Sequence, residues 1–336
     1  MNRIEIRAVT PSVQKSFDLA LGGIGYERRA RYALTELTPR AVTRIGLEFE
    51  DRQVYDFDDN RRAFEKAKFS RIPARTENIA SVLARWVRDS TVTDGRLRAW
   101  IDISSLTRPL IATICYQLWS QAQTDERVIH ASFVYSQARF SPPPDDYGPI
   151  AHKGAVIPEF AGWTDDPAMP CSAIFGIGYE AGLALGALED LEPADAWAFR
   201  PTGHVSAYDR AINRNNADFL AELRPEHILT YDVNAPLQLV ANLESLVYGA
   251  LDTRRIVIIP FGLKTFALAA CLVALQHFPR VNIWRVSGGT FTEPINRLPN
   301  GTIVQLDVLL TGTQIEMPFS TSAPTASAYS LVDRIA

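Results

Sequence analysis

An internal repeat constrains the fold of this chain more than any other feature of its sequence. The segment FDLALGGIGYE, which ends at Glu27, returns as SAIFGIGYE, which ends at Glu180, at an offset of 153 residues. The segments 100–119 and 256–278 correspond in the same order, at an offset of 156. Because repeated segments in a constant order indicate duplicated structural units, we expect two related halves that share a site.

Composition places the chain among soluble globular proteins. Its 336 residues are 47% hydrophobic and 21% charged, which is enough for two domains with full cores. The N-terminus lacks the apolar stretch of a signal peptide, and no run of eighteen apolar residues is present to cross a membrane. We therefore expect a cytoplasmic protein with no membrane partner.

The three cysteines, Cys115, Cys171 and Cys271, lie in or beside apolar segments. They lack the paired spacing of a metal site or a disulfide framework. Cys115 and Cys271 are equivalent in the repeat, which favours a packing role on buried helices. We expect no metal and no cofactor, and a reducing compartment fits this cysteine usage.

The net charge of −4 is divided unequally along the chain. Residues 1–150 carry 22 Lys and Arg against 19 Asp and Glu, and residues 151–336 carry 12 against 19. The net charges of +3 and −7 favour docking of the two halves, or of two copies of the chain, by electrostatic attraction. Two solvent-exposed surfaces of different character would give the same net charges. The absence of a basic tail makes duplex DNA an unlikely partner, and the oligomeric state stays open.

Strand and helix patterns alternate through both halves. The expected strands are short and almost continuously apolar, which is typical of strands covered on both faces in a parallel sheet. They fall at 17–23, 41–49, 69–73, 97–103, 128–135, 171–177, 195–200, 226–232, 254–260 and 281–286. The expected helices fall at 26–38, 58–67, 76–90, 108–122, 179–191, 209–223, 235–250 and 264–278. This order predicts an α/β fold of two duplicated three-layer Rossmann-like units with mainly parallel sheets, plus a short C-terminal β extension.

Proline content and the limits of the repeat set the domain boundaries. We assign 1–145 to the first half, 146–170 to a linker that follows three consecutive prolines, 171–289 to the second half, and 290–336 to a C-terminal extension and tail.

The repeated GIGYE segment follows the first strand of each half. Gly23, Gly25 and Gly178 allow the backbone to turn sharply and to approach a ligand closely. In parallel α/β sheets, ligands bind at such strand-to-helix turns, beside helix N-termini. The dinucleotide motif G-x-G-x-x-G is missing, because Arg28 and Ala181 occupy its last glycine position, so the motif gives no support for NAD.

Other residues of the GIGYE turns are candidates for ligand binding. Tyr26 and Tyr179 could stack on a base or simply cover the end of the sheet. Glu27 and Glu180 begin their helices, where the helix dipole alone would favour a carboxylate. Arg28 adds positive charge to the first turn only. Minor candidates lie at the starts of the second helices, where the repeat aligns Asn60 and Arg61 with Asn213 and Arg214. Asp232 and Asn234, at the end of a later strand, are two more.

The fourth strand of the first half ends in a more distinctive polar turn. Asp102, Ser104, Ser105, Thr107 and Arg108 lie at the start of a helix, where hydroxyls, backbone amides and a guanidinium can hold phosphate oxygens. Serine and threonine also cap helices, and Asp102 could serve only to brace the turn. The number of polar groups favours ligand binding over capping alone.

The equivalent turn of the second half contains Gly262, Lys264 and Thr265. It keeps a cation and a hydroxyl but lacks the carboxylate and both serines of the first turn. A lysine binds phosphate as a point charge where an arginine binds it as a fork. This divergence predicts a ligand without perfect twofold symmetry, or one active and one supporting half-site.

The PFGLKTFALAA segment resembles the Gly-Thr-Lys turn of the CARF family of cyclic-oligonucleotide sensors, with Lys264 at the lysine position. Two such units in one chain resemble SAVED domains and tandem CARF proteins. The resemblance covers about residues 17–289, and the first half departs from it by having Ser-Leu-Thr-Arg in place of Gly-Thr-Lys. It implies a ligand bound across a pseudo-twofold axis by the first and fourth turns of both units, in bacterial defence or signalling.

The sequence therefore predicts a pseudo-dimeric sensor for a nucleotide-like anionic ligand, with a separate effector protein as a possible partner. One alternative is a phosphoesterase or nucleotide hydrolase, with Glu27 or Asp102 as general base and Ser104 or Ser105 beside Arg108 holding a phosphate. Another alternative is a scaffold subunit of a defence complex. The enzyme hypothesis has no P-loop, nucleophile elbow or metal-binding motif to support it.

Overall fold

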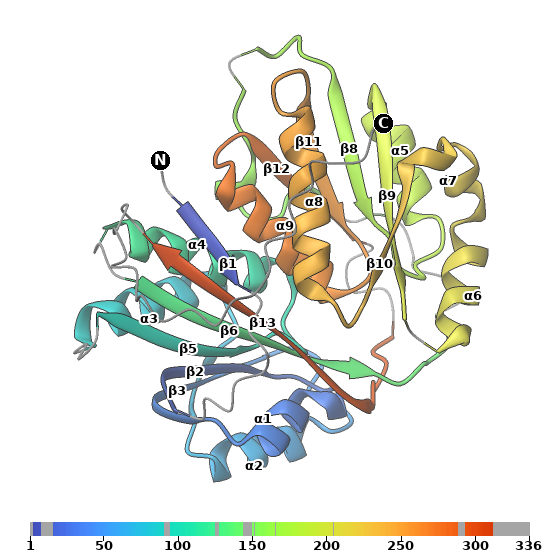
Figure 1. The fold of residues 1–336 in the computed structure, drawn as a ribbon. Coiled ribbons are helices and arrows are strands. Elements are labelled where there is room, and N and C mark those ends of the chain that lie inside the picture. The colour runs from blue at the N-terminus through green and yellow to red at the C-terminus, as the bar shows by residue number, and fades with distance from the viewer. Residues whose placement is uncertain are drawn as a thin grey trace, which may run out of the picture.

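The structure is a computed structural model. It describes residues 3–7, 16–90, 95–124, 128–143, 150, 152–164, 166–203, 205–287 and 293–311. The chain forms two sheets with helices between their strands, as Figure 1 shows. The predicted α/β fold of two Rossmann-like units is confirmed.

The first sheet has seven strands in the order β1-β13-β6-β5-β2-β3-β4. Its strands are β1 (Arg3–Arg7), β2 (Ser16–Ile24), β3 (Arg40–Glu48), β4 (Ser70–Pro73), β5 (Arg96–Asp102), β6 (Val128–Ala138) and β13 (Pro299–Thr311). Strands β2 to β6 are parallel, and β13 and β1 add an antiparallel edge beyond β6. The helices of this unit are η1 (Arg28–Arg31), α1 (Tyr32–Leu37), α2 (Phe57–Lys66), α3 (Thr76–Asp89) and α4 (Arg108–Thr124).

The second sheet has six strands in the order β10-β9-β8-β11-β12-β7. Its strands are β7 (His152–Ala155), β8 (Cys171–Gly176), β9 (Asp195–Thr202), β10 (Ile228–Asp232), β11 (Arg255–Pro260) and β12 (Val281–Ser287). Only β7 runs antiparallel to its neighbour. The helices of this part are η2 (Pro158–Phe160), α5 (Leu183–Leu191), α6 (Ser206–Asn215), α7 (Ala217–Ala221), η3 (Pro225–His227), α8 (Pro236–Ala250) and α9 (Lys264–Gln276).

The five parallel strands follow the same order in both units. In each sheet the first strand lies between the second and the fourth, so that β2 pairs with β5 and β8 pairs with β11. The turns that leave the first and fourth strands therefore emerge side by side in each unit. This is the position where open α/β sheets bind ligands.

Two of the antiparallel strands come from segments outside the predicted halves. Strand β7 lies within the stretch assigned to the linker, and β13 lies within the C-terminal extension but pairs with β6 of the first sheet. The first unit is thus completed by a strand that follows the second unit in the sequence. The predicted tail beyond residue 311 lies outside the described residues.

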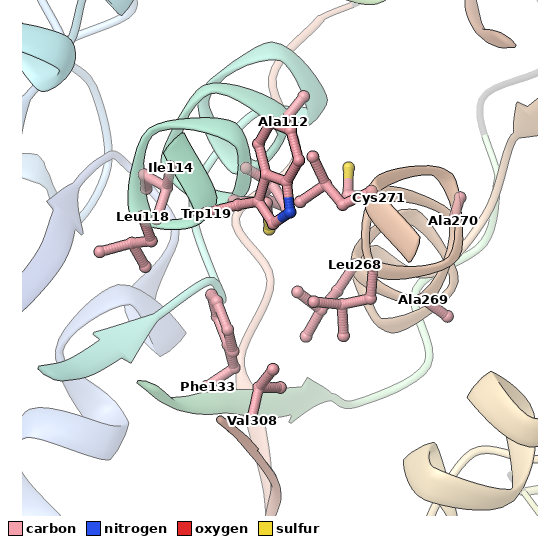
Figure 2. Packing of buried hydrophobic residues seen from close by; sticks show 14 of the residues in the cluster. Ala112, Ile114, Leu118, Trp119, Phe133, Leu268, Ala269, Ala270, Cys271 and Val308 are labelled. Carbon is pink, nitrogen blue, oxygen red and sulfur yellow. The ribbon is translucent and has the colours of Figure 1, made fainter. Parts of the chain in front are cut away.

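One hydrophobic core joins the two units. Its largest cluster contains residues of both sheets and of the helices α3, α4, α8 and α9. Helix α9 is apolar on nearly all sides, which is typical of a helix that is buried all round, and the residues of α4 from Leu110 to Cys115 are buried as well. Figure 2 shows Trp119 of α4 and Cys271 of α9 in the contact between these helices, with Phe133 and Val308 below them.

The equivalent cysteines meet at this contact. Burial and the neighbouring Cys271 thiol raise the pKa of Cys115 well above its ordinary value. Both side chains are buried thiols, which supports the packing role expected from the sequence. Within the described ranges, no helix is both long enough and apolar enough to span a membrane.

Candidate ligand-binding site between the two units

The first and fourth turns of the first unit are locked together by close packing. A Cβ atom on Gly23 would lie 2.6 Å from the Ser105 hydroxyl oxygen, and Ser105 donates a hydrogen bond of 2.8 Å to the Gly23 carbonyl. A larger residue at position 23 would displace Ser105. Gly23 and Ser105 therefore shape the turn instead of facing a ligand.

A buried asparagine fixes the GIGYE turn in each unit. Asn60 of α2 donates hydrogen bonds of 2.7 and 2.9 Å to the carbonyls of Gly25 and Glu27. Asn216, at the start of α7, donates one of 2.7 Å to the carbonyl of Gly178. Asn216 is thus the counterpart of Asn60. The alignment of Asn60 with Asn213 was wrong, because Asn213 is exposed and accepts a hydrogen bond from Arg200.

The polar turn after β5 is braced internally by Asp102. One Asp102 oxygen accepts hydrogen bonds from the Ser104 amide (2.8 Å) and hydroxyl, and the Ser104 hydroxyl accepts one of 2.8 Å from the Ser136 amide. The other oxygen has no hydrogen-bond partner among the described residues. Burial raises the pKa of Asp102 to about 6. These bonds give Asp102 and Ser104 the bracing role that the sequence left open.

The repeat-equivalent cations reach across from each unit to the other. Arg108, at the start of α4, donates a hydrogen bond of 2.9 Å to the Gly262 carbonyl. Lys264, at the start of α9, donates one of 2.5 Å to the Ser104 carbonyl. Each fourth turn therefore binds the main chain of its counterpart.

Glycine is required where the turns of the second unit touch. A Cβ atom on Gly178 would lie 2.4 Å from the Cα of Gly262. Gly262 also has a φ of 64°, which favours glycine. The GIGYE turn and the turn before α9 consequently pack backbone against backbone.

A cavity of about 190 Å³ opens between the facing turns. Both units and the segment before β13 contribute to its wall. The lining residues are Glu27, Arg29, Arg108, Tyr135, Gln137, Ala138, Gly178, Tyr179, Glu180, Pro201, Tyr208, Ile212, Gly262, Leu263, Lys264 and Arg297.

Glu27 is clamped between two guanidinium groups. Its two oxygens lie 2.5 Å from Arg29 and 2.9 Å from Arg297. Although burial opposes ionisation, these cations and Lys264 lower the pKa of Glu27 to about 2. Arg297 also donates a hydrogen bond of 3.1 Å to the Tyr179 hydroxyl, so it links the two units across the cavity.

Positive charge exceeds negative charge in the cavity wall. Four cationic side chains line it, against the carboxylates of Glu27 and Glu180. Burial, together with Arg29, Arg297 and Arg108, lowers the pKa of Lys264 to about 7 even though Glu27 acts in the opposite direction. An anion placed here would relieve the repulsion among these cations.

Two stacked tyrosines form one side of the cavity. The rings of Tyr179 and Tyr208 lie 5.8 Å apart with an interplanar angle of 9°. Tyr208 of α6 also donates a hydrogen bond of 3.0 Å to the Arg139 carbonyl of the first unit. The aromatic side is therefore held by both units. It offers flat apolar surface beside the cations.

Residues 293–298, which we call the strap, cross the first GIGYE turn before β13 begins. Asn296 accepts a hydrogen bond of 2.9 Å from the Arg28 amide and donates one of 2.6 Å to Asp56. The Arg29 amide donates one of 3.2 Å to the Arg297 carbonyl. These contacts hold Arg297 over the cavity, so part of the predicted C-terminal extension contributes to the site.

The structure brings together seven of the predicted site residues in the cavity wall: Glu27, Arg108, Gly178, Tyr179, Glu180, Gly262 and Lys264. Gly23, Gly25, Asp102, Ser104 and Ser105 lie behind the wall and support the turns. Four others are not part of the wall: Tyr26, Arg28, Thr107 and Thr265. Arg28 and Thr107 are exposed, Tyr26 packs near Tyr55, and Thr265 is buried.

Several lining residues were missed by sequence reasoning. Arg29 follows Glu27 by two residues, but η1 turns Arg29 inward and leaves Arg28 exposed, a distinction that spacing alone does not give. Tyr135 and Gln137 lie at the end of β6, where the predicted strand stopped too early. Tyr208 has a counterpart that the repeat could have indicated, because Tyr55 lies at the same offset of 153 residues and packs near Tyr26 as Tyr208 stacks on Tyr179. Arg297 lies beyond the repeated segments.

In the part of the chain that the structure describes, no group of three or more His, Cys, Asp or Glu side chains could hold a metal ion.

The minor candidates Asp232 and Asn234 are exposed at the end of β10, and Asn234 accepts a hydrogen bond of 2.9 Å from Gln137. Because Gln137 lines the cavity, Asn234 lies directly behind the cavity wall, and Asp232 is bonded to Asn234.

No family model and no curated protein matches the chain. Among solved structures, the cytoplasmic domain of a prokaryotic cation chloride cotransporter matches with a TM-score of 0.23 and 7% sequence identity, over 81% of this chain and 95% of that chain. A match at this TM-score identifies neither a family nor a function for the chain.

Proposed function

We propose that the protein is a pseudo-dimeric binding protein that senses a small nucleotide-like anion in the cavity between its two units. The observation that carries this proposal is the concentration of Arg29, Arg108, Lys264 and Arg297 around one cavity. The chain as a whole is acidic, with a net charge of −4. Cations gathered at a single point of such a chain are most simply explained by an anionic ligand.

Two polar groups of the cavity wall are left for a ligand. Arg108 Nε and Glu180 Oε2 are buried and have no hydrogen-bond partner among the described residues. Buried polar atoms without partners are costly, so they are usually satisfied by water or by a bound molecule. A ligand with an acceptor for Arg108, a donor for Glu180 and a flat face for Tyr179 has the chemistry of a nucleotide.

The position of the cavity suits a sensor. A ligand there would contact both fourth turns, the strap and the helix starts that carry Arg108 and Lys264. Its binding would therefore change how the two units hold each other. The resemblance to CARF and SAVED proteins in bacterial defence or signalling agrees with this use, and a separate effector would receive the signal.

The hydrolase alternative gains no specific support. Glu27 is held ionised by Arg29 and Arg297, and a carboxylate with a pKa of about 2 is a poor proton acceptor at neutral pH. Asp102 lies behind the cavity wall with one oxygen bonded to Ser104. Glu27 lines the cavity but is a weak base, and Asp102 is not among the lining residues.

A ligand panel with one variant tests the proposal. Cyclic and linear nucleotides are incubated with the protein, and both the melting temperature and ligand turnover are measured. We expect stabilisation without turnover, and we expect Arg108→Ala to reduce the affinity by about ten- to a hundredfold because a charged hydrogen bond is lost.

The control for this test is Arg62→Ala, since Arg62 is exposed and its ion pair with Asp59 lies on the surface, away from the cavity wall. That variant keeps the full ligand response. If no nucleotide raises the melting temperature of the unmodified protein, the sensor proposal fails. Turnover of a nucleotide would establish the hydrolase alternative instead.

A further inference from the structure

Lys264 is an unusual choice of cation for its position. The chain contains 29 arginines and only five lysines, and the lining residues around Lys264 include three of those arginines. The equivalent residue of the first unit is Arg108. Arginine stays protonated in proteins, whereas the lysine amine can lose its proton and react. A lysine at this point gives the cavity a group that arginine could not supply.

The surroundings of Lys264 favour the neutral amine. Arg29, Arg108 and Arg297 act on it from η1, α4 and the strap, and burial adds to their effect. Glu27 is the nearby carboxylate, but both of its oxygens are bound by Arg29 and Arg297. No carboxylate among the described residues lies within ion-pair distance of Lys264. Its pKa of about 7 leaves a large fraction of the amine unprotonated near neutral pH.

The amine is both positioned and open to the cavity. Lys264 begins α9, and its Nζ donates to the Ser104 carbonyl at 2.5 Å, which holds the side chain in place. A neutral amine that donates one hydrogen to a carbonyl keeps its lone pair for a ligand. Since Lys264 lines the cavity, a bound molecule can reach it.

We propose that Lys264 forms a reversible imine with a small carbonyl compound that carries a phosphate or carboxylate group. The amine nitrogen adds to the carbonyl carbon, and the resulting carbinolamine loses water to leave a carbon–nitrogen double bond. Arg108 and Arg297 hold the anionic group, and Glu180, which has an unpartnered oxygen in the same wall, moves the proton to the departing hydroxyl. Lysines beside other cations are activated in this manner.

This activity goes beyond the proposed sensor and uses the same cavity. It requires an anionic ligand with an aldehyde or ketone but does not require a nucleotide. The cavity of about 190 Å³ suits a compact molecule.

Borohydride trapping tests the inference on the full chain. The protein is incubated with pyridoxal 5′-phosphate or pyruvate and cyanoborohydride, which reduces an imine to a stable secondary amine. Peptide mass spectrometry then gives the rate of labelling at each lysine. The exposed residues Lys66, Lys68 and Lys153 serve as comparisons within the same molecule.

We expect Lys264 to be labelled at least about tenfold faster than these exposed lysines at pH 7, because burial and the neighbouring arginines favour its neutral amine. Its rate should rise through pH 7 and then level off. Unphosphorylated pyridoxal should label it more slowly. Lys264→Arg should remove the fast site, and Lys153→Arg should keep it.

Labelling of Lys264 at or below the rate of the exposed lysines would overturn the inference. Stabilisation by pyridoxal 5′-phosphate without trapping would also overturn it, while leaving an anion site intact. A rise in melting temperature with a nucleotide tests only the sensor proposal. The sensor proposal and the imine inference can therefore fail separately. Faster trapping of pyruvate than of pyridoxal 5′-phosphate would identify a carboxylate as the preferred anion.

Discussion

Glu27 links two cations of the cavity wall to the first GIGYE turn. It lies between Arg29 and Arg297, and Asn60 holds its carbonyl. A buried ion pair adds little net stability to the folded protein, because removing both charges from water costs about as much as their attraction gains. Removal of one partner is costly, because the other charge then stays buried without a counter-charge. Glu27 therefore holds two guanidinium groups at positions where an anionic ligand could also reach them.

Glu27→Gln should lower the free energy of unfolding by about 3–5 kcal/mol at pH 7, because Arg29 and Arg297 lose their counter-charge. The pKa of Glu27 falls from an ordinary value of 4.5 to about 2 on folding. Its contribution is thus complete above pH 4.5 and is lost as the pH falls through 2. Denaturant unfolding of both proteins should show their difference narrowing over that pH window.

The matched control is Glu65→Gln, since Glu65 is exposed and lies 3.6 Å from Arg71. We expect a change of less than about 1 kcal/mol for this variant at any pH. A Glu27→Gln difference that stays constant between pH 7 and pH 2 would contradict the clamp.

Some residues of the site could be predicted and others could not, for physical reasons. Arg108 and Lys264 were found because equivalent cations at equivalent turns are visible in the repeat. Arg297 belongs to a segment that has no counterpart, and only folding brings it to Glu27. Asp102 and Ser104 have the residue types of a ligand site, yet their polar atoms are directed into the turn.

At the scale of elements, the parallel strands and a C-terminal β extension were predictable, whereas the pairing partners of the antiparallel strands were not. Strands such as β8 and β11 are covered on both faces and show continuous apolar runs. The antiparallel strands β7 and β13 pair with β12 and β6, and nothing local to their sequences indicates those partners. Register between distant segments depends on tertiary packing instead of on local preference.

The GIGYE turn of each unit is supported by an asparagine from the helical segment that follows the second strand. In the first unit it is Asn60 of α2, and in the second it is Asn216 between α6 and α7. Asn60→Ala and Asn216→Ala should each destabilise the protein by about 1–3 kcal/mol, because buried carbonyls of the turn lose their donors. Chemical denaturation measures both. Asn213→Ala is the control, since Asn213 is exposed, and we expect a change within about 0.5 kcal/mol. A larger effect at position 213 than at 216 would restore the original alignment.

At the scale of the whole molecule, the two units form one cooperative structure. The largest core cluster joins both sheets through α4 and α9, and β13 returns from the second unit to the first sheet. Because destabilisation of a shared core is felt by every element that packs on it, the units should unfold together. Such coupling is what a sensor needs to convert a ligand at the central cavity into a change across the molecule.

Val308→Ala tests this coupling. Val308 of β13 is fully buried below the α4–α9 contact (Figure 2), so its truncation should cost on the order of 2 kcal/mol. Amide hydrogen exchange then measures where protection is lost. If the core is shared, β8 and β11 of the second unit should lose as much protection as β5 and β6. Val42→Ala, at a residue that is 88% exposed, should leave exchange unchanged. Protection lost only in the first sheet would show that the units unfold separately, and a ligand signal would then have to pass through the turns and the strap alone.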